Sequence, residues 1–153
     1  MKKLFILFVI LGAVAFVGMA MAATDTENLN VTASVAASCQ ITAVTDIAFG
    51  AYDPTSSTPT DAAGNMTLRC VKATSYKTYV SGTRSMTGGS DTLNFALYSD
   101  SDRTTTFPSD NSGSSVEASS NAAVTQDIYG RIPAEQDVGV ESYSATLTAT
   151  VEY

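Results

Sequence analysis

Histidine and tryptophan are both absent from this chain of 153 residues. Histidine is the side chain that titrates near neutral pH, and it is the commonest metal ligand in proteins. Its absence excludes the Ser–His and Cys–His arrangements that activate a nucleophile, and it excludes most zinc sites. The sequence also lacks a Gly-x-Ser-x-Gly elbow and a glycine-rich phosphate loop. We therefore predict no enzymatic activity, no catalytic or metal-binding residues and no cofactor.

A pair of carboxylates, as glycosidases use, is the one catalytic arrangement that the composition leaves open. Asp100 and Asp102 form a close pair, but no glycine and glutamate follow them at the spacing of a calcium-binding loop. We interpret the pair as part of a solvated turn.

Basic residues are scarce. Beyond residue 22 the chain has six of them, since Lys2 and Lys3 precede that point, against 15 acidic residues, which gives a formal charge of −9. An acidic surface argues against nucleic acid and anionic lipid as partners. We also expect no small-molecule substrate.

Residues 1–22 have the three parts of a secretion signal peptide. Lys2 and Lys3 supply the positive charge, an apolar stretch follows, and Ala20-Met21-Ala22 fits a peptidase site. The alternative is an N-terminal membrane anchor, because the apolar stretch is long. We predict cleavage, since polar residues follow the small ones at once.

Two cysteines, Cys39 and Cys70, remain in a chain that we expect to be exported. An even number of cysteines in an oxidising compartment indicates a disulfide, the alternative being two buried thiols. A bridge here would close a loop of about 30 residues, for which chain entropy gives roughly 3–4 kcal/mol of stabilisation.

Short alternating runs, separated by glycine, aspartate and proline, make up the rest of the chain and indicate an all-β fold. The clearest run is the last, residues 143–153, in which apolar and polar residues alternate strictly. Shorter runs include Ile47-x-Phe49-x-Ala51, Met66-x-Leu68-x-Cys70 and Leu93-x-Phe95-x-Leu97. Seven or eight such strands in one domain predict a β-sandwich, with a barrel as the alternative.

An unmatched strand at each end of the chain suggests that subunits complete one another. A sandwich that lacks its final strand leaves a groove and an unpaired edge, and an added peptide strand would fill both. The groove edge is predicted at alternate residues of the last run: Ala145, Leu147, Ala149, Val151 and Tyr153. The added strand is predicted at alternate residues near the other end: Leu29, Val31, Ala33 and Val35. The alternative is that residues 27–43 form an ordinary first strand that pairs within its own chain.

Four segments, in order and with both cysteines, resemble spore coat protein U domains. They are Phe49-Gly50-Ala51-Tyr52-Asp53-Pro54, residues 93–104, Ile128-Tyr129-Gly130-Arg131-Ile132-Pro133-Ala134, and the terminal run 142–153. The sequence departs from the family at Glu135 and Glu141, where glycine is common, and at Pro108. The first two departures lie in predicted turns and affect local turn geometry.

The resemblance implies an incomplete immunoglobulin-like β-sandwich that lacks its last strand and is completed by a donor strand. That family includes the major pilins of archaic chaperone–usher pili. The implied organisation is a signal peptide in residues 1–22, a donor-strand segment in residues 23–36 and a pilin domain in residues 37–153. The implied partners are neighbouring pilin copies, a periplasmic chaperone and an outer-membrane usher.

The favoured hypothesis is therefore a pilus shaft subunit, exported through the periplasm to a cell-surface fimbrium that serves adhesion and biofilm formation. The first alternative is a secreted, self-complemented and monomeric coat or matrix protein of the same fold. The second is a carbohydrate-binding module or hydrolase, for which tyrosines such as Tyr98 and Tyr129 would supply a platform.

Overall fold

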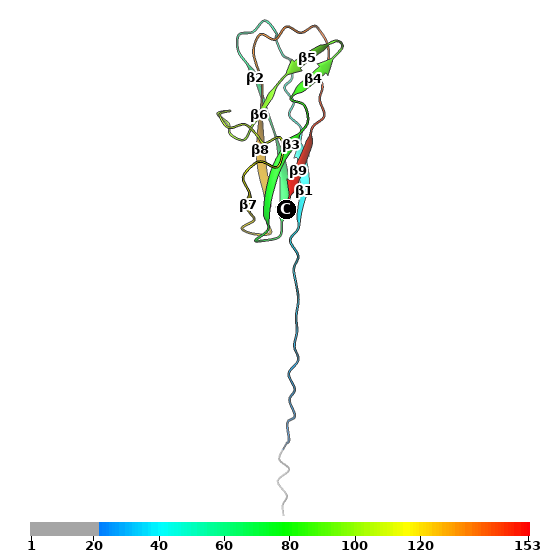
Figure 1. Ribbon diagram of the computed structural model, residues 1–153, viewed down its shortest axis with the longest axis vertical. Helices are drawn as coiled ribbons and strands as arrows, with labels where there is room; N and C mark the ends of the chain where they lie inside the picture. Colours follow the sequence, from blue (N-terminus) through cyan, green and yellow to red (C-terminus); the bar gives the residue numbers. More distant parts are fainter. Residues whose placement is uncertain (1–21) are drawn as a thin grey trace, which may run out of the picture. The chain divides into compact units, whose positions relative to one another are not determined.

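Every regular element in residues 22–153, the part of the chain that the computed structural model describes, is a β-strand (Figure 1). The strands are β1 (Cys39–Thr45), β2 (Thr60–Cys70), β3 (Ser75–Ser81), β4 (Ser85–Gly88), β5 (Asp91–Asn94), β6 (Ala96–Tyr98), β7 (Val116–Glu117), β8 (Ala123–Ile132) and β9 (Thr148–Glu152). The all-β prediction is confirmed. None of the described residues forms a helix long and apolar enough to cross a membrane. The predicted signal peptide lies outside the described residues, apart from Ala22.

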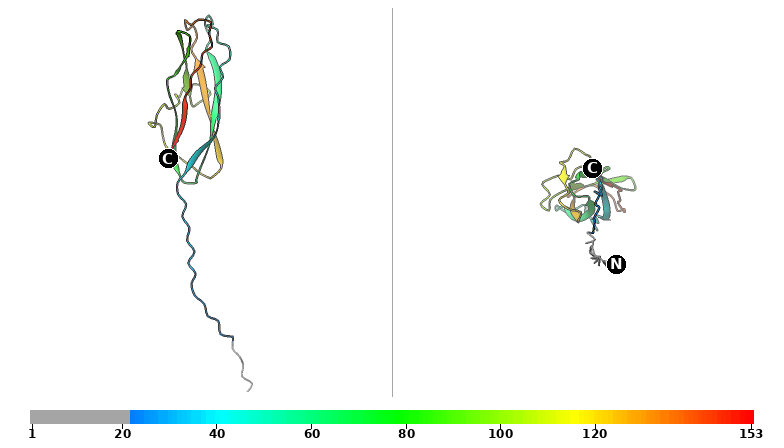
Figure 2. Two further views of the ribbon diagram at one scale, coloured as in Figure 1. Left: turned by 90° about the vertical axis from the view of Figure 1, so that its right-hand side faces the viewer. Right: turned by 90° about the horizontal axis from the view of Figure 1, so that it is seen from below.

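The strands form antiparallel sheets, and the immunoglobulin-like sandwich that we predicted is confirmed (Figure 2). One sheet has the order β1-β2-β8-β6, a second has the order β7-β3-β9, and β4 pairs with β5 as a hairpin. The longest ladder joins β2 to β8 and runs from the pair Thr60–Ile132 to the pair Arg69–Ala123.

The alternating pattern of β2 builds one side of the core. Met66, Leu68 and Cys70 are buried, while Arg69 between them is exposed, as a strand with one covered face requires. The other strands of this sheet, the other sheets and the loops supply the remaining buried apolar side chains, among them Tyr76, Val80, Leu93, Phe95, Leu97, Phe107, Ile128 and Ile132. The core therefore lies between the β2–β8 pair and β3, with β5 and β6 beside it.

The predicted disulfide is confirmed between Cys39 and Cys70, with an S–S distance of 2.02 Å. The two residues are direct partners in the ladder between β1 and β2. The bridge therefore fixes the first residue of β1 to the last residue of β2.

Two predicted strands differ from the structure. Residues 47–51 are extended, but they belong to no strand, and the strand predicted over residues 143–153 is a continuous ladder only from Thr148. Before Thr148 a single bridge pairs Ser144 with Thr87. A strand needs a backbone partner as well as an alternating pattern, and among the described residues these stretches lack a continuous one.

Candidate docking groove

An apolar groove of about 840 Å³ opens between two extended stretches of the chain. We call residues 44–54 the early wall, which starts at the last two residues of β1. We call residues 138–149 the late wall, which ends at the first two residues of β9. Between the walls lies a floor of apolar side chains from five strands and Phe95: Val80, Met86, Leu93, Phe95, Leu97, Ile128 and Ile132. Most of the floor residues belong to the buried core or pack against it.

Two glycines beneath the early wall let it lie close to the first sheet. A Cβ atom on Gly130 of β8 would stand 2.7 Å from Phe49 and 3.0 Å from Ile47. A Cβ atom on Gly64 of β2 would stand 2.8 Å from Ile47 and would also collide with the carbonyl oxygen of Thr45. The Phe49 ring also packs against Phe95, with the ring centroids 6.0 Å apart. Side-chain packing on these two glycines therefore holds the part of the early wall beyond Thr45, because that part has no ladder partner.

Backbone hydrogen bonds and one carboxylate hold the late wall to the β4–β5 hairpin. Thr87 and Ser144 exchange N–H···O bonds of 3.1 and 3.2 Å. The Gly139 N–H donates to the Asp91 carboxylate at 2.7 Å, and the Tyr143 hydroxyl donates to the Gly139 carbonyl at 3.0 Å. Desolvation, with the nearby Asp91 and Glu141 carboxylates, raises the pKa of Tyr143, so this hydroxyl stays neutral and remains a donor.

At one end of the groove, the Tyr52 hydroxyl links the early wall to the turn from Pro133 to Gln136, which lies just before the late wall. It donates to the Pro133 carbonyl and accepts from the Gln136 N–H, both at 2.9 Å. The Gln136 side chain in turn pairs with the backbone of Asn94, at the end of β5, through bonds of 2.8 and 2.9 Å. We call Tyr52, Gln136 and Asn94 the latch.

The predicted groove-edge residues fall into two sets. Ala145, Leu147 and Ala149 line the groove. Val151 packs against the core, and Tyr153 is 60% exposed. Within the described part of the chain β9 pairs with β3 alone, so its other edge has no ladder partner. That the predicted groove-edge residues receive an added strand stays a prediction.

The predicted donor residues belong to no strand. The chain divides into two units at Ala33. In the first, Leu29 is 88% exposed and Val31 is 85% exposed, and Ala33 is also exposed. Val35, in the second unit, is 80% exposed. Such exposure of large apolar side chains is the feature that needs an explanation, because a soluble protein normally covers most of them.

Sequence reasoning did not identify the early wall as part of a site. Ile47 and Phe49 were expected in an ordinary strand, and Tyr52 only as the end of one. A usable signal was present in Gly64 and Gly130, because a glycine inside a strand often marks the close approach of another segment. Gln136 carried no local signal.

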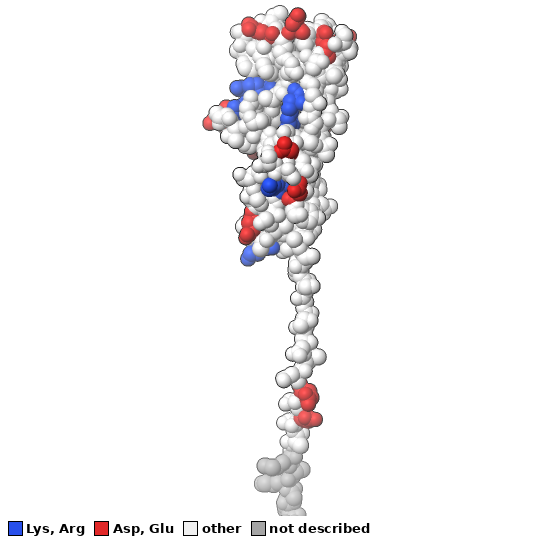
Figure 3. All heavy atoms as spheres, viewed as in Figure 1, with Lys and Arg blue, Asp and Glu red and all other residues white. Residues whose placement is uncertain are grey.

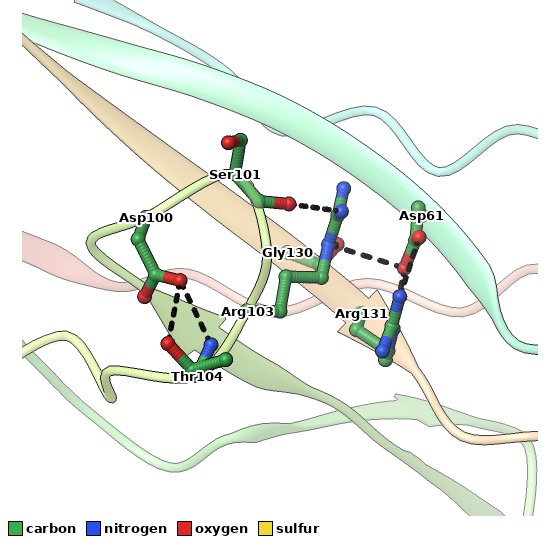
Figure 4. Close-up of polar contacts among 7 residues, drawn as sticks. All are labelled: Asp61, Asp100, Ser101, Arg103, Thr104, Gly130 and Arg131. Carbon is green, nitrogen blue, oxygen red and sulfur yellow. Dashed lines mark hydrogen bonds and ion pairs between the residues drawn. The ribbon is translucent and has the colours of Figure 1, made fainter.

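Away from the groove, a group of polar residues around Asp61 and Asp100 form contacts with one another (Figure 4). Arg131 of β8 forms a bidentate pair with Asp61 of β2 at 2.7 and 2.8 Å, and Arg103 approaches the same carboxylate at 3.2 Å. Arg103 also lies over the Tyr129 ring, 5.8 Å from its centroid. The Asp100 carboxylate accepts bonds from Thr104 and Thr105 within its turn. These contacts tie the loop after β6 to β8 and cover the face of a tyrosine that was a candidate sugar platform.

No group of three or more acidic or cysteine side chains in residues 22–153 is arranged to hold a metal ion. The fold and the groove together define an immunoglobulin-like domain with an open apolar groove. Residues 25–150 match the Spore Coat Protein U domain, and the chain belongs to that family. A comparison with curated proteins finds no match. The family is a pilin and coat family rather than an enzyme family.

Proposed function

We propose that this protein is the shaft subunit of a pilus and that it polymerises by donor-strand complementation. The observation that carries the proposal is the apolar groove, open between two walls, with an unpaired strand edge beside it. The proposed occupant is the donor-strand segment, residues 23–36, of a neighbouring copy. That segment offers Leu29, Val31, Ala33 and Val35 at alternate positions, which is the spacing needed to place four side chains on one face of a strand.

The energies involved support a tight association. Full burial of Leu29, Val31 and Val35 would contribute roughly 1.5–3 kcal/mol for each side chain. Each new ladder hydrogen bond would add about 0.5–1.5 kcal/mol. The ordering of an extended segment opposes both contributions. The balance favours a complex that survives dilution and mild detergent.

An open groove also explains the proposed partners. Before assembly, the floor residues and the free edge of β9 would be accessible to any exposed strand, and such edges promote aggregation. A periplasmic chaperone would cover the groove during export, and an outer-membrane usher would exchange it for the next subunit's donor segment. The domain organisation that follows is a signal peptide in residues 1–22, the donor segment in residues 23–36 and the pilin domain in residues 37–153. The resulting fimbrium would serve adhesion and biofilm formation.

The test compares two double variants of the full chain, expressed with its neighbouring assembly genes. Leu29→Asp with Val31→Asp places charges on the proposed inward face. Asn30→Asp with Thr32→Asp adds the same charge to the opposite face. We expect the first variant to lose surface fibres by electron microscopy and the ladder of boiling-sensitive multimers on a gel, because buried carboxylates are costly. The second should keep both.

Equal loss in both variants, or fibres that persist after deletion of residues 23–35, would contradict donor-strand assembly. A wild-type protein that is a stable monomer would support the alternative function, a secreted coat or matrix protein of the same fold.

A further inference from the structure

The latch replaces a direct turn hydrogen bond with a tyrosine hydroxyl. In the turn from Pro133 to Gln136, the hydroxyl of Tyr52 lies between the first carbonyl and the last N–H, 2.9 Å from each. A hydroxyl both donates and accepts, so it satisfies the two backbone groups at once. The turn is thereby joined to the early wall, 84 residues away in sequence.

The latch connects the early wall to the segment before the late wall and to the floor of the groove. Tyr52 belongs to the early wall, Gln136 lies two residues before the late wall, and Asn94 adjoins the floor residues Leu93 and Phe95. Among the described residues, no other hydrogen bond joins the early wall to residues 133–149. The separation of the walls at this end therefore depends on the hydroxyl and on the Gln136–Asn94 pairing.

We propose that Tyr52 and Gln136 are positioning residues, which hold the walls at the spacing that an inserted strand requires at this end of the groove. The inference rests on the proposed function. A groove that already has its binding geometry loses less conformational entropy when a strand is inserted. The complex is therefore tighter and dissociates more slowly. In this role the latch acts through the spacing of the walls.

The direction of the inserted strand decides which donor residue depends on the latch. Every ladder in the described sheets is antiparallel, and a strand added antiparallel to the late wall would run from β9 toward Val138. Val35 would then lie at the latch end and Leu29 at the far end. This direction also keeps Asp25 and Glu27 away from the carboxylates that surround Gly139, where like charges would repel.

The experiment is a pair of double-mutant cycles in the full chain, measured as the rate at which isolated multimers dissociate in detergent at a fixed temperature. Tyr52→Phe removes the hydroxyl and keeps the ring, and we expect dissociation to accelerate roughly five- to tenfold, the effect of about one to two lost hydrogen bonds. Combined with Val35→Ala, the acceleration should be smaller than the product of the single effects. Combined with Leu29→Ala, it should equal that product, because distant sites act independently.

Tyr129→Phe is the matched control, since its hydroxyl bonds only to the exposed Asp127, at 3.4 Å, and its strand position faces away from the groove. It should leave the rate unchanged. Gln136→Leu is a second variant that keeps the N–H bond to Tyr52 but removes the pairing with Asn94, and it should accelerate dissociation in the same way. If Tyr52→Phe fails to fold, the dissociation rate of Gln136→Leu tests the positioning role instead.

Unchanged rates in both latch variants would overturn the inference while leaving donor-strand assembly intact. Equal coupling of Tyr52→Phe to Leu29→Ala and to Val35→Ala would also overturn it, because the variant would then loosen the whole domain. A wild-type chain that forms no multimers would refute donor-strand assembly itself, and the positioning role with it.

Discussion

Glu135 adopts a left-handed backbone conformation, with φ at 56°. A side chain in this region costs roughly 1–2 kcal/mol, because its Cβ approaches a carbonyl oxygen, whereas glycine has no Cβ. Glu135 lies in the turn from Pro133 to Gln136 that the Tyr52 hydroxyl bridges, so the strained residue stands beside the groove.

Glu135→Gly is expected to raise the free energy of unfolding by about 1 kcal/mol, because relief of the strain exceeds the entropy that glycine adds to the unfolded chain. Urea unfolding of the full chain measures it. Ala134→Gly is the neighbouring control: Ala134 has no positive φ, so the change should cost about 0.4–1 kcal/mol. A Glu135→Gly variant that is less stable than wild type would contradict the strain argument.

At the scale of elements, the early wall beyond the end of β1 is extended backbone that belongs to no sheet. Its apolar side chains cover Gly64 and Gly130, and the absence of side chains on those two residues sets how deeply the wall lies. The late wall is held differently, by a backbone bridge and by Asp91. One side of the groove therefore depends on packing and the other on hydrogen bonds.

Gly130→Ala is expected to destabilise the domain by about 1–3 kcal/mol, since the new methyl group would push Phe49 and the early wall outward. Multimers of this variant should also dissociate faster. Ala63→Val adds volume to the exposed face of β2 and should change stability by no more than about 0.5 kcal/mol. Thermal unfolding monitored by circular dichroism compares them, and equal effects of the two substitutions would show that Gly130 has no special role.

On the scale of the whole molecule, acidic side chains dominate the charge. The face in Figure 3 carries them at the end of the domain nearest β4 and β5, with both signs elsewhere. Hydrogen bonds lower the pKa of several carboxyls below the ordinary value of 3.8. For Asp61 the donor is Arg131, and for Asp100 the donors are the backbone N–H groups of Thr104 and Thr105. Asp53 and Asp110 are lowered in the same way by Thr55 and Ser112.

These shifts predict acid sensitivity without any transition near neutral pH. A carboxyl whose pKa is lower in the folded state stabilises the fold above its unfolded pKa, and the contribution disappears as the pH falls through the folded value. Stability should therefore be nearly constant between about pH 5 and 8, since no histidine titrates there, and should fall below about pH 4. Urea midpoints across this range measure it.

Asp61→Asn should be less stable at neutral pH and should lose less stability on acidification, whereas Asp25→Asn, which lies outside the sheets, should follow the wild type. A step in the wild-type profile near pH 6.5 would contradict this account.

The periodic part of the fold could be predicted from the sequence, and the site only in outline. Met66, Leu68 and Cys70 alternate because one face of β2 is buried, and the predicted export signal, with an even number of cysteines, made the Cys39–Cys70 bridge predictable. Residues 47–51 alternate for another reason, packing on glycines, which periodicity cannot distinguish from pairing in a sheet. The link from Tyr52 to Gln136 joins distant residues through one hydroxyl, and no local pattern encodes it.

The covalent link between Cys39 and Cys70 has a mechanical consequence. A tensile load applied to the residues before Cys39 would pass through the sulfur atoms to the end of β2, so it would not peel β1 away one bond at a time. From the end of β2 the load would act parallel to the ladder of ten consecutive residue pairs between β2 and β8. In this shear geometry the ladder hydrogen bonds must break together. A chain of such domains would resist stretching until a large force had accumulated.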